Sequence, residues 1–410
     1  MRRKIELLIP AGSLEVLRVA VDYGADAVYI GGEAFGLRAK AHNFTLDEMR
    51  EGCDYCHSHN AKLYVTVNIF AHNEDLPGVR QYLERLKTVP VDALIISDPA
   101  IFTMAREILP QMELHVSTQA NNTNYGIYRF WYGLGAKRVV SARELSLEEL
   151  KEIRSNIPDD MEIESFIHGA MCISYSGRCL LSNFLTGRDA NQGACTHPCR
   201  WQYSVVEEKR PGEYFPVEED ERGTYIFNSK DLCMIEHIPE LVEAGIDSFK
   251  IEGRMKTALY VATVARTYRK AIDDYRKDEQ LYRDHLDYYR EEIGKCTYRQ
   301  FTTGFYFGKP GPDEQVYDSN EYVKEYTYIG TIEDVDEQGY AHFIQRNKFA
   351  VGETVEAMQF DGTNLSLTVQ GIWNEKDEAV LSAPHPKEPL TVDLGAKLEK
   401  GMILRRRTVE

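Results

Sequence analysis

Four cysteines lie close together near the middle of the chain. Cys172, Cys179, Cys195 and Cys199 fall within 28 residues at the spacing C-x6-C-x15-C-x3-C. Four thiolates in so short a segment can surround one metal centre, because short loops bring their ends together at little entropic cost. Structural zinc sites usually show two tight C-x2-C pairs, so the wide first spacing favours an iron–sulfur cluster. A zinc site and four unrelated thiols are the alternatives.

The elements around this segment alternate short apolar runs with longer amphipathic stretches, a pattern typical of βα units. The predicted strands cover 5–9, 27–31, 63–67, 93–97, 114–117, 138–141, 162–167 and 248–251. Eight units in about 255 residues predict an α/β fold, a (β/α)8 TIM-like barrel. An open doubly wound sheet is the alternative, but Pro10-Ala11-Gly12-Ser13 replaces the G-x-G-x-x-G that such a sheet would carry after its first strand.

Polar residues are dense where the predicted strands end. They include Asn68, residues 117–119, Arg143, His168 and the run 250–254. TIM-barrel active sites lie at the C-terminal ends of the strands, so we expect the functional site at this mouth.

The residue pattern also divides the chain into regions. About 80 residues separate the seventh and eighth predicted strands, too many for an ordinary loop, which predicts a cysteine-rich insertion over about 168–235. With its trailing helices the barrel takes up 1–307 and is followed by a linker at 308–323. Short alternating strands then predict a small C-terminal β-barrel domain over 324–410.

Composition limits the classes of partner. The 410 residues include 48 Lys and Arg against 65 Asp and Glu, a net charge of −17, which argues against nucleic-acid binding over the whole surface but allows a local basic patch. The basic start lacks a signal-peptide apolar core, and no run of about 18 apolar residues predicts a membrane span. We expect a cytoplasmic protein with no membrane partner and reduced thiols.

Two further motifs favour a structural interpretation. Cys53, Cys56 and His57 read as the haem-attachment pattern C-x-x-C-H, but they lie in a predicted helix and are expected to pack. Tyrosines recur every seven residues, which returns a helix to almost the same face. A packing seam is favoured there over an aromatic ladder for RNA; these are Tyr268, Tyr275, Tyr282 and Tyr289.

One longer pattern resembles a known family. Residues 164–182 read E-x-F-x-x-G-A-M-C-x4-G-R-C-x-L-S, which is similar to the signature of the collagenase-like peptidase family U32. The resemblance begins near ELLIPAGS, continues through GIDSFKIEGRMKT and extends into the small C-terminal domain, so it covers nearly the whole chain.

Within that family the chain resembles tRNA hydroxylation proteins, and this implies a function. Such proteins form 5-hydroxyuridine at the wobble position of tRNA with prephenate as co-substrate or ligand. The resemblance implies a [4Fe-4S] cluster on Cys172, Cys179 and Cys195, with Cys199 as fourth ligand and Cys233 as the alternative. It makes tRNA and prephenate the expected partners and leaves room for a homologous partner subunit.

The resemblance also suggests roles for residues at the strand ends. Prephenate carries two carboxylates, and bidentate recognition of carboxylates calls for arginine, so Arg38, Arg143 and Arg254 are the substrate-binding candidates. The catalytic candidates are Lys250, as a point charge, His168, which could move protons, and Glu252. For each arginine the alternative is a salt bridge inside the barrel, for example between Arg254 and Glu252, and for His168 it is a silent core position.

Two other functions are alternatives. A collagenase-like peptidase of unknown catalytic type would need a thiolate oriented by a histidine, and Cys172 and His168 are close in sequence. A cysteine that holds iron is not free for that attack, and the chain carries neither H-E-x-x-H nor G-x-S-x-G. The second alternative is a noncatalytic RNA-binding protein with a structural cluster.

Overall fold

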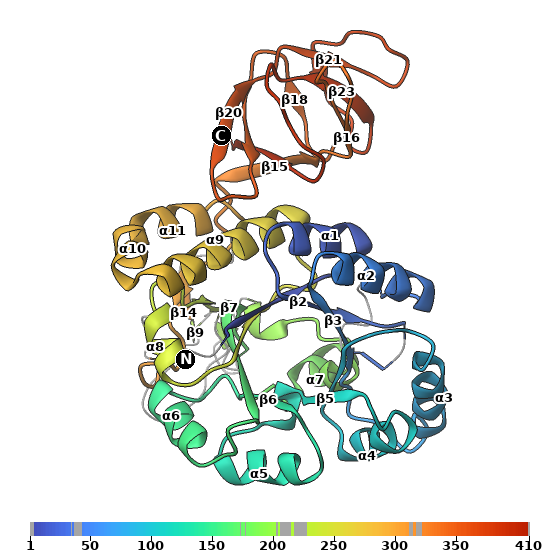
Figure 1. Ribbon diagram of the computed structural model, residues 1–410, viewed down its shortest axis with the longest axis vertical. Helices are drawn as coiled ribbons and strands as arrows, with labels where there is room; N and C mark the ends of the chain where they lie inside the picture. Colours follow the sequence, from blue (N-terminus) through green and yellow to red (C-terminus); the bar gives the residue numbers. More distant parts are fainter. Residues whose placement is uncertain are drawn as a thin grey trace. The chain divides into compact units, whose positions relative to one another are not determined.

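The computed structural model describes residues 4–33, 35–36, 43–172, 174–176, 178–201, 204–205, 215–216, 228–310, 315–316 and 322–408 (Figure 1). The chain divides into two compact units. The first unit comprises Met1–Ser13, Asp26–Met255 and Arg299–Tyr322. The second comprises Leu14–Ala25, Lys256–Tyr298 and Val323–Glu410.

The first unit is built on a closed barrel of eight parallel strands. These are β1 (Glu6–Pro10), β2 (Ala27–Gly31), β3 (Lys62–Val67), β4 (Ala93–Ile96), β5 (Glu113–Val116), β6 (Arg138–Val140), β7 (Glu162–Ala170) and β12 (Ser248–Ile251). Each strand pairs with the next, and β12 pairs with both β7 and β1, which closes the ring. The strands read as nearly continuous apolar runs because both faces are buried. The predicted TIM-like barrel is confirmed, and the open sheet is excluded.

Helices follow most of the barrel strands of this unit (Figure 1). They are α2 (Leu46–Ser58), α3 (Leu76–Leu86), α4 (Pro99–Ile108), α5 (Tyr125–Gly133), α6 (Leu147–Ser155) and α8 (Ile238–Glu243). Thr45 and Ser146 begin α2 and α6 with capping boxes, which satisfy backbone N–H groups at the helix start. Cys53 and Cys56 are fully buried on α2, and burial raises the pKa of each thiol to about 12, which confirms that they pack.

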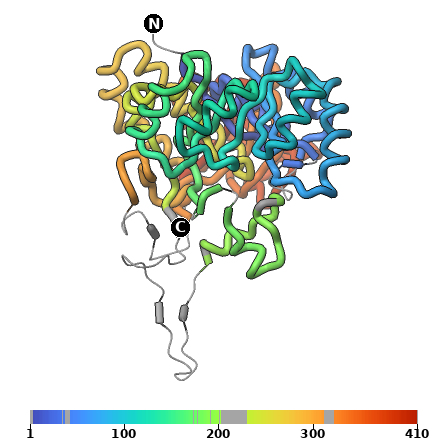
Figure 2. The backbone as a smooth tube through the Cα atoms, turned by 90° about the horizontal axis from the view of Figure 1, so that it is seen from below, coloured from blue at the N-terminus to red at the C-terminus, as the bar shows by residue number. Residues whose placement is uncertain are grey.

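An insertion separates β7 from β12. It contains α7 (Leu181–Thr186), the 3-10 turns η2 (Ala190–Gln192) and η3 (Pro198–Arg200), and the short strands β8 (Ser204–Val205), β9 (Phe215–Pro216), β10 (Asn228–Ser229) and β11 (Asp231–Cys233). The insertion returns to the barrel where β11 pairs antiparallel with β7 and parallel with β13 (Phe301–Thr302). Figure 2 shows the part that carries α7 projecting from the barrel. Strand β14 (Gln315–Val316) pairs with β10.

The second unit combines helices with an antiparallel β-rich domain. Its helices are α1 (Leu14–Asp22), α9 (Ala258–Lys277), α10 (Glu279–Asp284) and α11 (Leu286–Ile293). Its strands are β15 (Tyr326–Thr331), β16 (Asp334–Val335), β17 (Ala341–Ile344), β18 (Phe349–Ala350), β19 (Thr354–Met358), β20 (Asn364–Thr368), β21 (Gly371–Trp373), β22 (Ser382–Ala383), β23 (Pro389–Asp393) and β24 (Ile403–Arg407). They form the four-stranded sheets β15-β24-β19-β20 and β16-β17-β23-β21 and the pair β18-β22, around an apolar core.

Buried polar contacts hold this second unit together. Glu292 of α11 lies between Arg266 of α9, at 2.6 Å, and Arg405 of β24, at 3.0 Å. The two guanidinium groups hold the pKa of the buried Glu292 at about 2, against the opposing effect of burial itself. The four tyrosines of the seven-residue repeat are buried, as expected for a packing seam. No helix of the described ranges is long and apolar enough to cross a bilayer.

Candidate functional site

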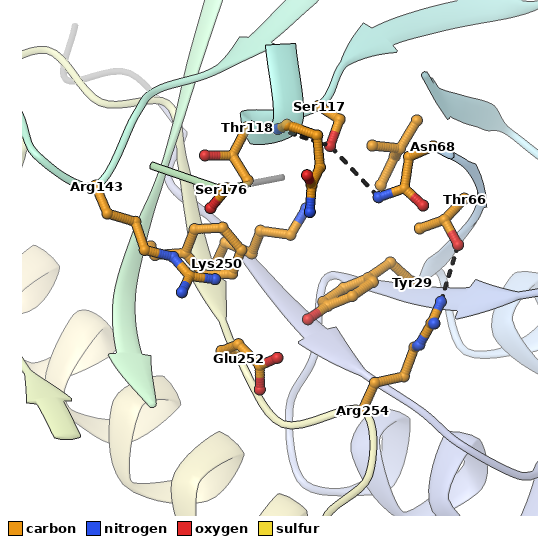
Figure 3. Close-up of a pocket in the computed structure, with 13 residues that line it drawn as sticks. Tyr29, Thr66, Asn68, Ser117, Thr118, Arg143, Ser176, Lys250, Glu252 and Arg254 are labelled. Carbon is orange, nitrogen blue, oxygen red and sulfur yellow. Dashed lines mark hydrogen bonds between the residues drawn. The ribbon is translucent and has the colours of Figure 1, made fainter. Parts of the chain in front are cut away.

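A polar pocket opens at the C-terminal ends of the barrel strands (Figure 3). Its volume is about 90 Å³. The described residues that line it are Tyr29, Thr66, Asn68, Ile95, Ser117, Thr118, Gln119, Arg143, Phe166, Ser176, Lys250, Glu252 and Arg254. Four of the site residues predicted from the sequence line this pocket. They are Arg143, after β6, Lys250, on β12, and Glu252 and Arg254, after β12.

Lys250, on β12, stands at the base of this pocket. Its side chain is only 5% exposed, and Nζ lies 2.6 Å from the Oε1 atom of the fully buried Glu164. The ammonium group also lies 4.5 Å from the centre of the Tyr29 ring and 5.4 Å from that of Phe166, within the range of cation–π attraction. Burial lowers the pKa of Lys250, the ion pair with Glu164 opposes that shift, and the positive charge of Arg143 adds to it.

Below Lys250 the barrel interior holds a network of ion pairs. Arg138 of β6 lies 3.2 Å from Glu164 and 2.5 Å from Glu162, and it also pairs with Glu6 of β1. Burial alone would raise the pKa of Glu6, but Arg138 holds it at about 2. Burial likewise opposes ionisation of Glu164, yet Lys250 and Arg138 together lower its pKa. Each buried charge therefore has an opposite partner, which fixes the direction of the Lys250 side chain.

Arg254 enters the pocket from the residues after β12. Nη1 donates to the Oγ1 atom of Thr66 at 2.9 Å, and the residue is 6% exposed (Figure 3). Two glycines make room for it. A Cβ on Gly12 would lie 2.4 Å from the Arg254 carbonyl oxygen, and one on Gly31 would lie 2.5 Å from Nη1. The ends of β1 and β2 are thus shaped around this arginine.

Arg143 reaches the same pocket from the residues after β6. Nη1 donates to the carbonyl oxygen of Ala170 at 3.0 Å, and the guanidinium carbon lies 4.1 Å from the centre of the Phe166 ring. The buried Nε atom has no hydrogen-bond partner among the described residues. An unpaired buried N–H is costly, so this donor is suited to a ligand atom.

Glu252 and His168 are placed differently, although a backbone hydrogen bond of 2.9 Å joins Glu252 N to His168 O. Glu252 lines the pocket, whereas His168 is not among the described lining residues. Lys250 pairs with Phe166 and Ile251 with His168, so β7 carries one extra residue as a bulge. The bulge breaks the side-chain alternation, and the His168 ring is buried 5.6 Å from Phe301.

The third arginine candidate, Arg38, lies outside the described residues. Tyr29, Thr66 and Phe166 line the pocket but are not among the site residues predicted from the sequence, where Phe166 appears only in the family signature. The Tyr29 hydroxyl donates to the Ile251 carbonyl at 2.9 Å, so it joins β2 to β12. Strand alternation was the available signal, because Tyr29 and Phe166 are the bulky inward residues of their strands.

The cysteine segment has suitable donors that are not assembled around one point. Cys172 is exposed, Cys179, Cys195 and Cys199 are partly exposed, and none of these four forms a disulfide. Among the described residues, no group of three or more His, Cys, Asp or Glu side chains is close enough to hold a metal ion. The alternative ligand Cys233 lies on β11, opposite His168. The thiol chemistry suits an iron–sulfur cluster, and the four thiols would have to draw together to hold one.

The pocket is therefore best suited to a small anion. Two guanidinium groups and one ammonium group face a single cavity whose other polar groups are neutral, apart from Glu252. Guanidinium groups bind carboxylates through paired N–H donors, and partial burial strengthens such contacts.

Known proteins share both parts of this chain. Residues 12–316 match Peptidase family U32, and residues 324–405 match the Peptidase family U32 C-terminal domain. The chain is 42% identical to tRNA hydroxylation protein P1 of Bacillus subtilis over 98% of this chain and 95% of that protein. It is 39% identical to tRNA hydroxylation protein P of Escherichia coli over 93% and 92%. A collagenase of Porphyromonas gingivalis is 36% identical over 74% of each chain.

Proposed function

Since the chain belongs to peptidase family U32, we propose that it is an RNA-modifying enzyme that hydroxylates the wobble uridine of tRNA to 5-hydroxyuridine with prephenate. Support comes from relatives named as tRNA hydroxylation proteins that align along nearly the whole chain. Similarity of that extent includes the barrel, the insertion and the C-terminal domain, so it is not limited to a shared fold.

The observation that carries the proposal is the cationic pocket at the barrel mouth. In the proposed complex Arg143 and Arg254 bind the two carboxylates of prephenate, and Lys250 supplies a further positive charge. The bond from Arg254 to Thr66 and the ion pair of Lys250 with Glu164 hold these groups in place before the ligand arrives. Preorganised charges of this kind lose little entropy on binding.

Proton transfer is proposed for Glu252, which lines the same pocket. His168 would act on the reaction only through the backbone it shares with Glu252, because the described pocket lining does not include its ring. We further propose that Cys172, Cys179, Cys195 and Cys199 hold a [4Fe-4S] cluster, which when bound would supply electron-transfer chemistry. As the segment stands, these thiols would have to draw together to do so.

The experiment that tests the proposal is mass spectrometry of tRNA nucleosides. A strain that lacks the gene is expected to lose 5-hydroxyuridine and its derivatives, and the wild-type gene restores them. Unchanged nucleosides in the deletion strain would refute the proposal.

Peptidase activity is the second candidate, because a collagenase is among the relatives and the family bears that name. The described residues that line the pocket include neither a cysteine nor a histidine, so a thiolate–histidine pair is not found there. Purified protein that cleaves gelatin, and loses this activity in Cys172→Ala, would favour the peptidase.

A further inference from the structure

The first part of the insertion, residues 175–201, exposes five large apolar side chains. Phe184 on α7 is 84% exposed, and Trp201, after η3, is 46% exposed. We call the set the insertion surface; it consists of Tyr175, Leu180, Phe184, Leu185 and Trp201. Large apolar residues gathered on one short segment mark a contact surface more often than single exposed ones do.

The fold of the segment explains why these side chains face outward. The buried Ser182 hydroxyl donates to the Arg188 carbonyl at 2.7 Å, lies 3.0 Å from the Thr196 hydroxyl, and accepts from the Thr196 N–H at 3.0 Å. These bonds fix the inner face of α7 to the return of the chain. Phe184 lies on the other face of α7, and its side chain is exposed to solvent.

Contacts with the barrel hold this segment at the pocket. Gln192 Nε2 donates to the Phe70 carbonyl oxygen at 2.7 Å, and the Arg178 guanidinium lies 5.1 Å from the centre of the Phe70 ring. Ser176, next to Tyr175 in sequence, lines the pocket itself. The segment that carries the insertion surface is therefore attached to the barrel through Phe70 and contributes Ser176 to the pocket.

The charge of this segment differs from that of the chain. Residues 170–201 contain three arginines and one aspartate, with no lysine or glutamate, whereas the whole chain carries −17. Exposed aromatic rings next to arginines are the usual platform for unpaired nucleic-acid bases, which stack on the rings while the cations meet phosphates. RNA carries a phosphate on every nucleotide and so requires local positive charge, whereas a protein that docks on this surface does not.

From these observations we propose that the insertion surface binds a single-stranded RNA loop by stacking its unpaired bases on Phe184, Trp201 and Tyr175. The inference rests on the proposed function and deepens it, because it assigns the part of the chain that presents an RNA loop to the pocket. Arg178 contributes a phosphate contact, and the bases next to the target nucleotide stack on the rings.

The test measures affinity for a synthetic tRNA anticodon stem-loop with uridine in the first anticodon position. Each of Phe184→Ala and Trp201→Ala is expected to weaken binding about tenfold, the usual consequence of losing one stacked base. Phe130→Ala is the matched control, since Phe130 is a 58% exposed phenylalanine on α5, outside the insertion, and should leave affinity unchanged. Arg178→Gln should reduce the salt dependence of binding by about one phosphate contact.

A second readout uses Trp201 itself. Base stacking quenches indole fluorescence, so the stem-loop should quench the wild-type protein but have little effect on Trp201→Phe. That variant retains the buried Trp131 and Trp373 of β21, both outside the insertion. The same hairpin with its loop closed into a duplex should bind weakly to both proteins.

The outcomes separate this inference from the function it rests on. Wild-type protein that binds the stem-loop with affinity unaffected by Phe184→Ala and Trp201→Ala overturns the insertion surface and leaves the proposed function standing. Loss of a protein partner in these variants, with RNA affinity intact, overturns it equally. If the wild-type protein has no affinity for the stem-loop, the insertion surface is overturned. If deletion of the gene also leaves 5-hydroxyuridine unchanged, the proposed function is refuted as well.

Discussion

The substitution Gly31→Ala perturbs the pocket without replacing any of its charged residues. Gly31 ends β2, and its backbone does not require a glycine conformation. A Cβ there would lie 2.5 Å from Arg254 Nη1 and 3.0 Å from its guanidinium carbon. The flexible end of the arginine must therefore move, while the barrel strand stays in place.

The size of the effect follows from this distance. Ordinary contact begins near 3.4 Å, so the guanidinium group must retreat by about 1 Å, which breaks its 2.9 Å bond to Thr66. A misplacement of about 1 Å in a positioning group can cost about 100-fold in rate. A hydrogen bond to a charged group contributes about 1.5–3 kcal/mol, which agrees with a loss of ligand affinity of about 10- to 100-fold.

The assay compares function with stability in the same variant. The 5-hydroxyuridine content of tRNA should fall strongly in a deletion strain that carries Gly31→Ala, while the melting temperature of the purified protein changes by only a few degrees. Gly133→Ala is the control, because a Cβ at Gly133, at the end of α5, meets nothing within 4 Å. Normal 5-hydroxyuridine levels in Gly31→Ala would refute the role given to Arg254.

Three further predictions concern buried charges and cysteines. Glu164→Gln leaves the Lys250 ammonium buried without its carboxylate and should lower the free energy of unfolding in urea by about 3–5 kcal/mol; a loss below about 1 kcal/mol would contradict the ion-pair account. The pKa of Glu292 lies near 2, below its usual 4.5, so its contribution of about 3 kcal/mol is complete above pH 4.5 and disappears as the pH falls toward 2, and Glu292→Gln should remove this part of the acid dependence of unfolding. Cys172→Ser should abolish bound iron and acid-labile sulfide in anaerobically purified protein, whereas the buried Cys296→Ser should retain both; equal iron in the two variants would contradict the proposed ligand set.

The barrel could be predicted from the sequence because its signal is local. Each strand is a short apolar run, such as 93–96, and parallel strands buried on both faces leave that mark. The position of the candidate pocket could also be predicted, because polar residues such as Arg143 and Lys250 follow or end such runs and the closed barrel brings them together.

Other features depend on long-range pairing that no local pattern reveals. The bulge in β7, which separates His168 from Phe166, depends on the register between β7 and β12. The network of ion pairs under Lys250 joins β1, β6, β7 and β12. From the sequence alone, Glu6 would be taken for an exposed residue near the chain start. The need for glycine at position 31 appears only when Arg254 returns to β2 from more than 200 residues away.

The insertion shows the opposite limit. The spacing of its cysteines predicts a metal centre, yet the described thiols are not gathered, so the ligand set stays a prediction. Its exposed aromatic residues have no period or motif, and only their solvent exposure in the folded segment distinguishes them from core residues.

We propose that the pocket at the barrel mouth carries out RNA hydroxylation. The most direct measurement is the amount of 5-hydroxyuridine in tRNA from the deletion strain that expresses either wild-type protein or the double variant Arg143→Ala, Arg254→Ala at equal levels. We expect the wild-type protein to restore the nucleoside and the folded double variant to leave it absent. Full restoration by the double variant would contradict it.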